Sequence, residues 1–136
     1  NKITYVLRYA ERMNCMEKRI ARITRVDTVL NVVDRKLELG FLVQFRDNEK
    51  TLAINFREDD EKSWNTFFLL MELYYGYEKL CMFNALRGRD IWILQGDSRG
   101  IAFAVPYTER WVVNGEDGFY VEEDAREILA SKNQGK

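Results

Sequence analysis

The densest apolar stretch of this chain is FFLLMELYYGYEKLCMF, residues 67–83. Its longest uninterrupted apolar run is five residues, Phe67–Met71, after which Glu72 follows. A membrane-spanning helix needs about 20 apolar residues, so the stretch does not predict a membrane segment. On a helical projection, apolar side chains occupy most of the circumference: Trp64, Phe67, Phe68, Leu70, Met71, Leu73, Tyr74 and Tyr75. Because a helix that is apolar nearly all round must be covered on more than one side, we expect a core helix that is covered by a sheet and by either the first helix or a second copy of the chain.

The residues on either side of this stretch indicate where the helix begins and ends. The preceding REDDEKSW places acidic residues in a first turn, where Asp59 or Asp60 can cap the positive end of the helix. Gly76 is expected to end the helix after about Tyr75.

Upstream, three strands are expected at about 26–33, 37–46 and 50–57. VDTVLNVV is rich in β-branched residues, LELGFLVQF follows it, and TLAINF comes after the turn-like RDNEK. An alternative for the same region is a capped helix that begins at Asp27, with Val29, Val33 and Leu37 on one face and Gly40 just after its end.

A first helix is expected at residues 3–23. Six apolar side chains fall within an arc of about 140° on a helical projection: Val6, Ala10, Met13, Met16, Ile20 and Ile23. Four arginines fall on a separate arc of about 80°: Arg8, Arg12, Arg19 and Arg22. Glu17 lies inside the apolar arc, which argues against one uninterrupted helix.

Downstream of Gly76, KLCMFNAL fits either a helix or a strand, and strands are expected at DIWILQ, GIAFAVPY, RWVV and GFYV. Pro106 should lie at a strand end or sheet edge, because it cannot donate a ladder hydrogen bond. EEDAREILA predicts a short C-terminal helix. The expected fold is therefore one α+β domain over residues 1–130, a mainly antiparallel sheet packed against an N-terminal and a central helix, with a flexible tail at 131–136. This element order is similar to that of small dimeric chaperones of secretion effectors, although no motif carries residue roles across.

Composition excludes several kinds of chemistry. The chain contains no histidine, which removes Ser-His-Asp and Cys-His catalysis and every histidine-containing metal site. The 21 basic and 22 acidic residues give a net charge of −1, so no global field attracts nucleic acid. Cys15 and Cys81 lack any CxxC spacing and are expected to be reduced thiols, as in a cytoplasmic protein. We expect no cofactor and no metal, since phosphate-binding loops and the calcium-loop pattern are also missing.

Three kinds of function fit the remaining residues. A small non-catalytic module, an adaptor, inhibitor or chaperone-like regulator, would bind another protein through aromatic side chains, for which the candidates are Tyr107, Trp111, Phe119 and Tyr120. Trp111 and Tyr120 flank a polar turn and should be partly exposed, whereas Trp92 lies inside IWIL and should face the core. Self-association through the all-round apolar helix or the last hairpin would bury further apolar surface. A nucleic-acid-binding regulator would instead use Arg8, Arg12, Arg19 and Arg22, and the third alternative is an enzyme built on carboxylates at 58–61, Asp97, Glu116 and Asp117.

Overall fold

The computed structural model describes residues 2–4, 6–7, 16–78, 81–96 and 100–134, and they form an α+β fold. Its sheet has six strands in the order β3-β2-β1-β4-β5-β6, and each neighbouring pair is antiparallel. The strands are β1 (Arg19–Val33), β2 (Lys36–Arg46), β3 (Thr51–Arg57), β4 (Asp90–Gln95), β5 (Ile101–Ala104) and β6 (Trp111–Val113). The helices are α2 (Glu61–Glu78), α3 (Met82–Leu86) and α4 (Glu122–Gln134). Among the described residues, no helix is long and apolar enough to cross a membrane.

The three strands expected upstream of the central helix are confirmed, and the alternative helix beginning at Asp27 is wrong. β1 and β2 form a hairpin joined by the two-residue turn Asp34–Arg35, in which both residues have positive φ angles, 50° and 66°. Such a turn matches the right-handed twist of the strands that it joins. Strand pairing from Arg22 to Val33 therefore prevails over the helical spacing of Val29, Val33 and Leu37.

The helix expected at 3–23 is wrong at its C-terminal end. Residues 2–4 and 6–7 are helical and 8–15 lie outside the described residues, but β1 begins at Arg19. Ile20 pairs with Trp92, and the alternation of a strand buries Ala21 and Ile23 while it exposes Ile20. The apolar arc that placed Ile20 and Ile23 on one helical face therefore does not exist.

α2 and α3 cover one face of the sheet, which we call the inner face. The Phe67 ring of α2 lies with its centroid 4.9 Å from that of Phe41 on β2 and 6.4 Å from that of Phe56 on β3. The Phe83 ring of α3 meets Phe41 edge-on at 5.1 Å. Buried aliphatic side chains of the central strands, Ile93 among them, belong to the same core cluster.

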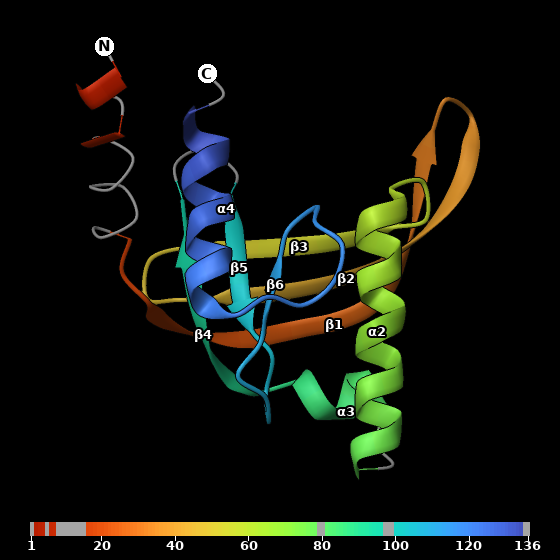
Figure 1. Ribbon diagram of the computed structural model, residues 1–136. Coiled ribbons are helices and arrows are strands. Elements are labelled where there is room, and N and C mark those ends of the chain that lie inside the picture. Colours follow the sequence, from red (N-terminus) through yellow and green to blue (C-terminus); the bar gives the residue numbers. More distant parts are fainter. Residues whose placement is uncertain (1, 5, 8–15, 79–80, 97–99, 135–136) are drawn as a thin grey trace.

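α4 covers the opposite, outer face of the sheet, but only over β4, β5 and β6 (Figure 1). Its Ala125 and Leu129 pack with Leu94, Ala102 and Val113 in a second cluster. The outer face over β1, β2 and β3 carries no helix of the described chain.

Both predicted helix ends differ from the structure. α2 continues through Gly76 to Glu78, so Gly76 does not end it. α4 runs to Gln134, so residues 131–134 of the expected tail are helical. The segment KLCMFNAL contains the short helix α3, and Pro106 follows the end of β5, as expected. GFYV forms only an isolated bridge between Tyr120 and Trp111.

Among the residues that the structure describes, only one side of the central helix is covered. Its buried side chains face the sheet and the loops beside it, where Thr66 bonds to Glu116 and Gly118: Ser63, Thr66, Phe67, Leu70 and Tyr74. Large apolar side chains elsewhere on its surface are exposed: Phe68, Leu69, Met71 and Tyr75. The described residues supply only the cover from the sheet side; residues 8–15 of the expected first helix lie outside them, and cover by a second copy stays a prediction.

Phe67 and Phe68 give a matched test of this packing, because they are adjacent and identical in chemistry. Phe67→Ala should lower the free energy of unfolding by about 3–5 kcal/mol, since it empties a space between two strands. Phe68→Ala should cost about 1 kcal/mol or less, because Phe68 is 54% exposed, although it loses ring contacts with Trp64 and Phe67. Urea unfolding followed by circular dichroism measures both values, and equal losses would contradict one-sided packing of α2.

Candidate protein-interaction surfaces

The hairpin of β1 and β2 extends beyond the rest of the sheet. β3 pairs with β2 only between Gly40 and Arg46, and β4 pairs with β1 only between Arg19 and Arg22. Residues 28–39 therefore form a two-stranded projection, which we call the arm, and Figure 1 shows it rising beside the first turns of α2. An isolated two-stranded hairpin is marginally stable in water, so the arm depends on the sheet at its base.

One face of the arm consists of four large apolar side chains that solvent reaches. Leu30 lies opposite Leu39, and Val32 lies opposite Leu37. Their side chains are exposed at 67% for Leu30, 39% for Leu39, 72% for Val32 and 70% for Leu37. Since side chains alternate along a strand, these residues lie on the same face as buried Phe41. The inner face of the sheet thus continues onto the arm without a cover.

A second exposed apolar surface lies on α2, on the side of the helix turned away from its buried residues. Phe68, Met71 and Tyr75 are spaced by three and four residues, so they form one stripe along the helix. Leu69, this stripe and the four arm residues expose an apolar area on the order of 800 Å² in total, divided between α2 and the arm; one partner in a standard protein–protein interface buries about as much. Exposed apolar patches larger than a few hundred Å² commonly mark interaction sites.

The opposite face of the arm base is polar and closely packed. The Arg57 guanidinium lies 2.8 Å from Asp59 Oδ2 and 3.7 Å from Glu38 Oε2. Partial burial and the neighbouring Asp59 carboxylate raise the pKa of Glu38 above its ordinary value. A Cβ at Gly40 would lie 2.7 Å from Asn31 Nδ2 and 2.8 Å from an oxygen of the Asn55 side chain, so glycine leaves room for both amides. The arm is therefore amphipathic, and its apolar face is the one suited to bury against protein.

The four aromatic residues predicted to bind protein do not form one surface. Trp111 is 5% exposed and packs beneath α4, so the expectation of partial exposure is wrong for it. Phe119 packs against the inner core, whereas half-buried Tyr120 packs against the cluster beneath α4. The Tyr120 hydroxyl donates to the Asp117 carbonyl at 2.6 Å, and burial with nearby Glu116 and Asp117 raises the pKa of Tyr120. Tyr107 is exposed and has the Arg89 guanidinium 4.3 Å from its ring centroid.

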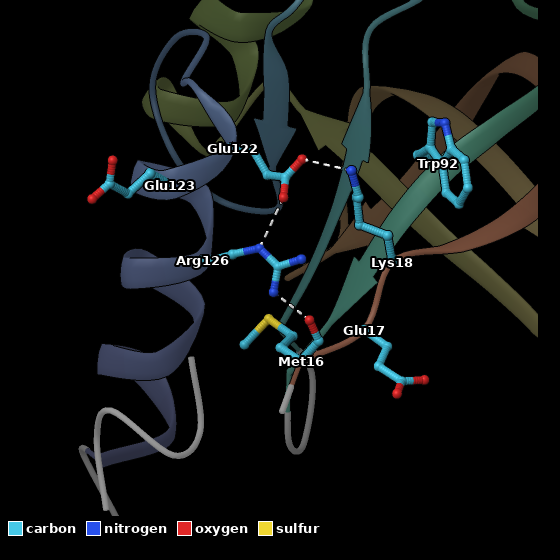
Figure 2. Close-up of a pocket in the computed structure, with 7 residues that line it drawn as sticks. All are labelled: Met16, Glu17, Lys18, Trp92, Glu122, Glu123 and Arg126. Carbon is cyan, nitrogen blue, oxygen red and sulfur yellow. Dashed lines mark hydrogen bonds and ion pairs between the residues drawn. The ribbon is translucent and has the colours of Figure 1, made fainter. Parts of the chain in front are cut away.

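Trp92 was expected to face the core, but it is 46% exposed on the outer face of the sheet. It borders an open groove of about 920 Å³ between β4 and the start of α4, lined by Met16, Glu17, Lys18, Trp92, Glu122, Glu123 and Arg126 (Figure 2). Glu122 accepts from both Lys18 and Arg126 at 3.0 Å, and Lys18 Nζ lies 5.4 Å from the Trp92 ring centroid. Burial would raise the pKa of Glu122, but the two cations outweigh it and lower that pKa. The cations of the groove are therefore already paired within the chain.

The arginine stripe is not assembled at the two positions that the structure describes. Arg8 and Arg12 lie outside the described residues. Arg19 Nε donates to Asp47 Oδ2 at 2.7 Å, and Arg22 Nε donates to Asp90 Oδ1 at 3.0 Å. Because Arg19 and Arg22 are three residues apart in a strand, their side chains project from opposite faces of the sheet. Nucleic-acid binding stays a prediction that these two residues do not strengthen.

Within the described part of the chain, no group of three or more Cys, Asp or Glu side chains is placed to hold a metal ion. Cys81 is an exposed free thiol.

Sequence patterns missed two exposed apolar features, the arm and Trp92. The β-branched residues of 26–33 predicted a strand of the arm, yet they carry no signal that β3 stops pairing at Gly40. Trp92 shares its apolar neighbours with core strands, and only the short reach of α4 leaves it uncovered.

Asp47 allows a test of the local electrostatics. Its carboxylate accepts the N–H groups of Glu49 and Lys50 at 2.8 and 2.9 Å and then the Arg19 side chain, and together these lower the pKa of Asp47. A lowered pKa stabilises the fold above the unfolded value of about 3.9, and that stability is lost as pH falls through the folded pKa.

Asp47→Asn should therefore lower the free energy of unfolding at pH 7, and the difference from the parent should vanish as the pH falls below about 4. Asp90→Asn is the control, because Asp90 and Arg22 are both more than half exposed and their pair is screened by solvent. Urea unfolding between neutral and acid pH measures both variants. If Asp47→Asn lowers the free energy of unfolding by the same amount in acid as at pH 7, the stabilising role of the Asp47 carboxylate is contradicted.

Comparison with protein-family models, curated proteins and solved structures found no match for this chain.

Proposed function

We propose that this chain is a small non-catalytic module, an adaptor, inhibitor or chaperone-like regulator, that binds another protein through the apolar face of the arm. The observation that carries the proposal is the continuation of the inner face of the sheet onto the arm, where Leu30, Val32 and Leu37 are each at least two-thirds exposed. Surface residues of this size are normally scattered singly, whereas these lie in cross-strand pairs.

The apolar area of the arm indicates that the arm does not bind a partner alone. Covering it would remove on the order of 400 Å² of apolar surface from water, worth about 10 kcal/mol at about 25 cal/mol per Å². Association costs about 4–15 kcal/mol in lost freedom of the two partners, so the arm alone gives a weak complex. The stripe of Phe68, Met71 and Tyr75 roughly doubles the area. We therefore include both surfaces in the proposed interface.

Two further parts of this proposal concern the N-terminus and the compartment. A helix before β1 that packs on the sheet remains a proposal, supported by helical residues 2–4 and 6–7 and by Met16, which is buried in the cluster beneath α4. A cytoplasmic location is proposed from the free, exposed thiol of Cys81, which a reducing compartment preserves.

Leu37→Lys tests the arm against the matched control Ile20→Lys, which places the same charge at an exposed apolar residue on the other face of the sheet. Burying one leucine contributes about 1.5–3 kcal/mol, so Leu37→Lys should weaken partner binding roughly 10- to 100-fold. Proteins retained from a host extract by the parent and by Ile20→Lys should then be lost with Leu37→Lys.

The retained protein is next purified and added back to the chain. Amide hydrogen exchange of residues 28–39 should slow in the complex, because the arm becomes covered. Retention of the same proteins by Leu37→Lys, or unchanged exchange across the arm, would contradict the proposed surface.

A further inference from the structure

We propose that Glu38 and Asp59 share a proton that fastens the arm to the turn between β3 and α2, so that the arm is held more firmly in mildly acidic solution than at neutral pH. This inference rests on the proposed function for the role of the arm, because it describes how that surface is positioned. Its tests need only the chain itself and no partner.

Glu38 belongs to the arm, whereas Asp59 lies in the turn that follows β3. The ladder between β2 and β3 ends at Arg57, and one further main-chain bond runs from the Glu58 N–H to the Leu39 carbonyl at 3.0 Å. Glu38 precedes Leu39 and Asp59 follows Glu58, so the antiparallel arrangement brings their side chains together. Any force between these two carboxyl groups therefore acts between the arm and the rest of the protein.

The turn that carries Asp59 is held by α2. The Arg57 N–H donates to Ser63 Oγ at 3.2 Å, and Ser63 Oγ donates to the Asp60 carbonyl at 3.2 Å. The Asp60 N–H also donates to the Arg57 carbonyl at 3.0 Å. Asp59 is thus positioned by groups outside the arm, whereas Glu38 moves with the arm.

One guanidinium lies near both carboxyl groups, but it contacts them unequally. Arg57 Nη2 lies 2.8 Å from Asp59 Oδ2 and 3.7 Å from Glu38 Oε2, and the second separation is too long for a hydrogen bond. Glu38 Oε2 is buried and has no hydrogen-bond donor among the described residues. A buried carboxylate oxygen without a donor destabilises the fold, and a proton on the carboxyl group removes that penalty by letting Glu38 donate to Asp59.

The charges around Glu38 favour this protonated form. Among the described residues, Asp59 and Arg57 are the two charged groups that act on its carboxyl group. The residue opposite Glu38 on β1 is Asn31, an uncharged amide, and Lys36 on the same strand is exposed, so solvent screens its charge. Partial burial and the Asp59 carboxylate outweigh the attraction of Arg57 and raise the pKa of Glu38 above its ordinary value.

The direction of the pH dependence follows from that raised pKa. The fastened arm binds the Glu38 proton more tightly than a detached arm, in which the carboxyl group titrates near its ordinary value of about 4.3. The stabilisation is therefore complete below about pH 4.3 and is lost as the pH rises through the raised pKa of Glu38. Above that pKa, Glu38 carries a second negative charge beside Asp59, which weakens the contact between the arm and the turn.

A titration of the Glu38 carboxyl carbon by NMR tests the shared proton. In the parent its pKa should lie above about 4.3, and Asp59→Asn should lower it, because the repelling charge is removed while Arg57 remains. Glu58→Gln is the matched control. It removes the same charge from the adjacent residue, whose carboxylate is not among the groups that act on Glu38, and it should leave the pKa of Glu38 unchanged.

Amide hydrogen exchange at Glu58 tests the fastening, because its N–H donates to the Leu39 carbonyl beside the carboxyl pair. Its protection factor should fall between about pH 4.3 and about pH 7, by about tenfold for a pKa of Glu38 raised by one. The Ile23 amide, which donates to the Arg89 carbonyl at 2.8 Å on the other side of β1, is the reference for pH effects on the rest of the sheet. Glu38→Gln should keep the acid value throughout, since its amide donates to Asp59 and carries no charge.

Three results would overturn the shared proton: a parent Glu38 that titrates at or below about 4.3, equal effects of Asp59→Asn and Glu58→Gln, or protection at Glu58 that does not depend on pH relative to Ile23. The outcomes also separate this inference from the proposed function. Loss of partner binding with Leu37→Lys beside an ordinary titration of Glu38 would remove the shared proton and leave partner binding standing. A pH-dependent arm whose Leu37→Lys variant still binds its partners would do the reverse.

Discussion

The contact between Phe67 and the sheet decides the arrangement of everything around it. Its ring lies between Phe41 and Phe56, and the ring of Phe83 closes the same cluster from α3. Burial of such aromatic groups is among the largest contributions that a small core can obtain. Once α2 is placed there, it covers the inner face over the body of β2 and β3, and the arm beyond them has no helix above it. Core formation and the exposure of the arm thus follow from one docking position.

The helix α4 likewise leaves part of the outer face of the sheet uncovered. It packs on Leu94, Ala102 and Val113, so the half of that face built from β1, β2 and β3 stays open. The exposure of Trp92, on the outer face of β4, follows from the same short reach. In the groove beside it, Lys18 and Arg126 are held by Glu122. Charged groups there neutralise one another, whereas the apolar groups of the arm have no counterpart within the described chain.

Much of the local structure was predictable from the residues. The β-branched residues of VDTVLNVV, followed by LELGFLVQF after three polar residues, predicted two strands, and acidic residues at 58–61 predicted the start of α2. The prediction of the first helix was wrong at Ile20 and Ile23, because apolar residues spaced by three also occur by chance in a strand. The strand partner that decides the structure there, β4, lies about 70 residues away. Gly76 was expected to end α2, but its location on the exposed side, with no atom near a would-be Cβ, lets the helix continue. The four aromatic candidates do not lie on one surface for a related reason, since Trp111 and Phe119 pack against different faces of the sheet.

By itself, the sequence determined the position of most strands and helices and excluded chemistry that needs histidine. It also showed more apolar side chains than one layer of helices can cover. These properties follow from local backbone geometry and composition, which neighbouring residues specify together. Only the tertiary structure decided which apolar residues are buried: Phe67 is, Phe68 is not, and Leu30 projects with the arm. The physical reason is that burial depends on where distant strands stop pairing and where helices dock, and the residues of the arm do not encode the length of β3 or β4.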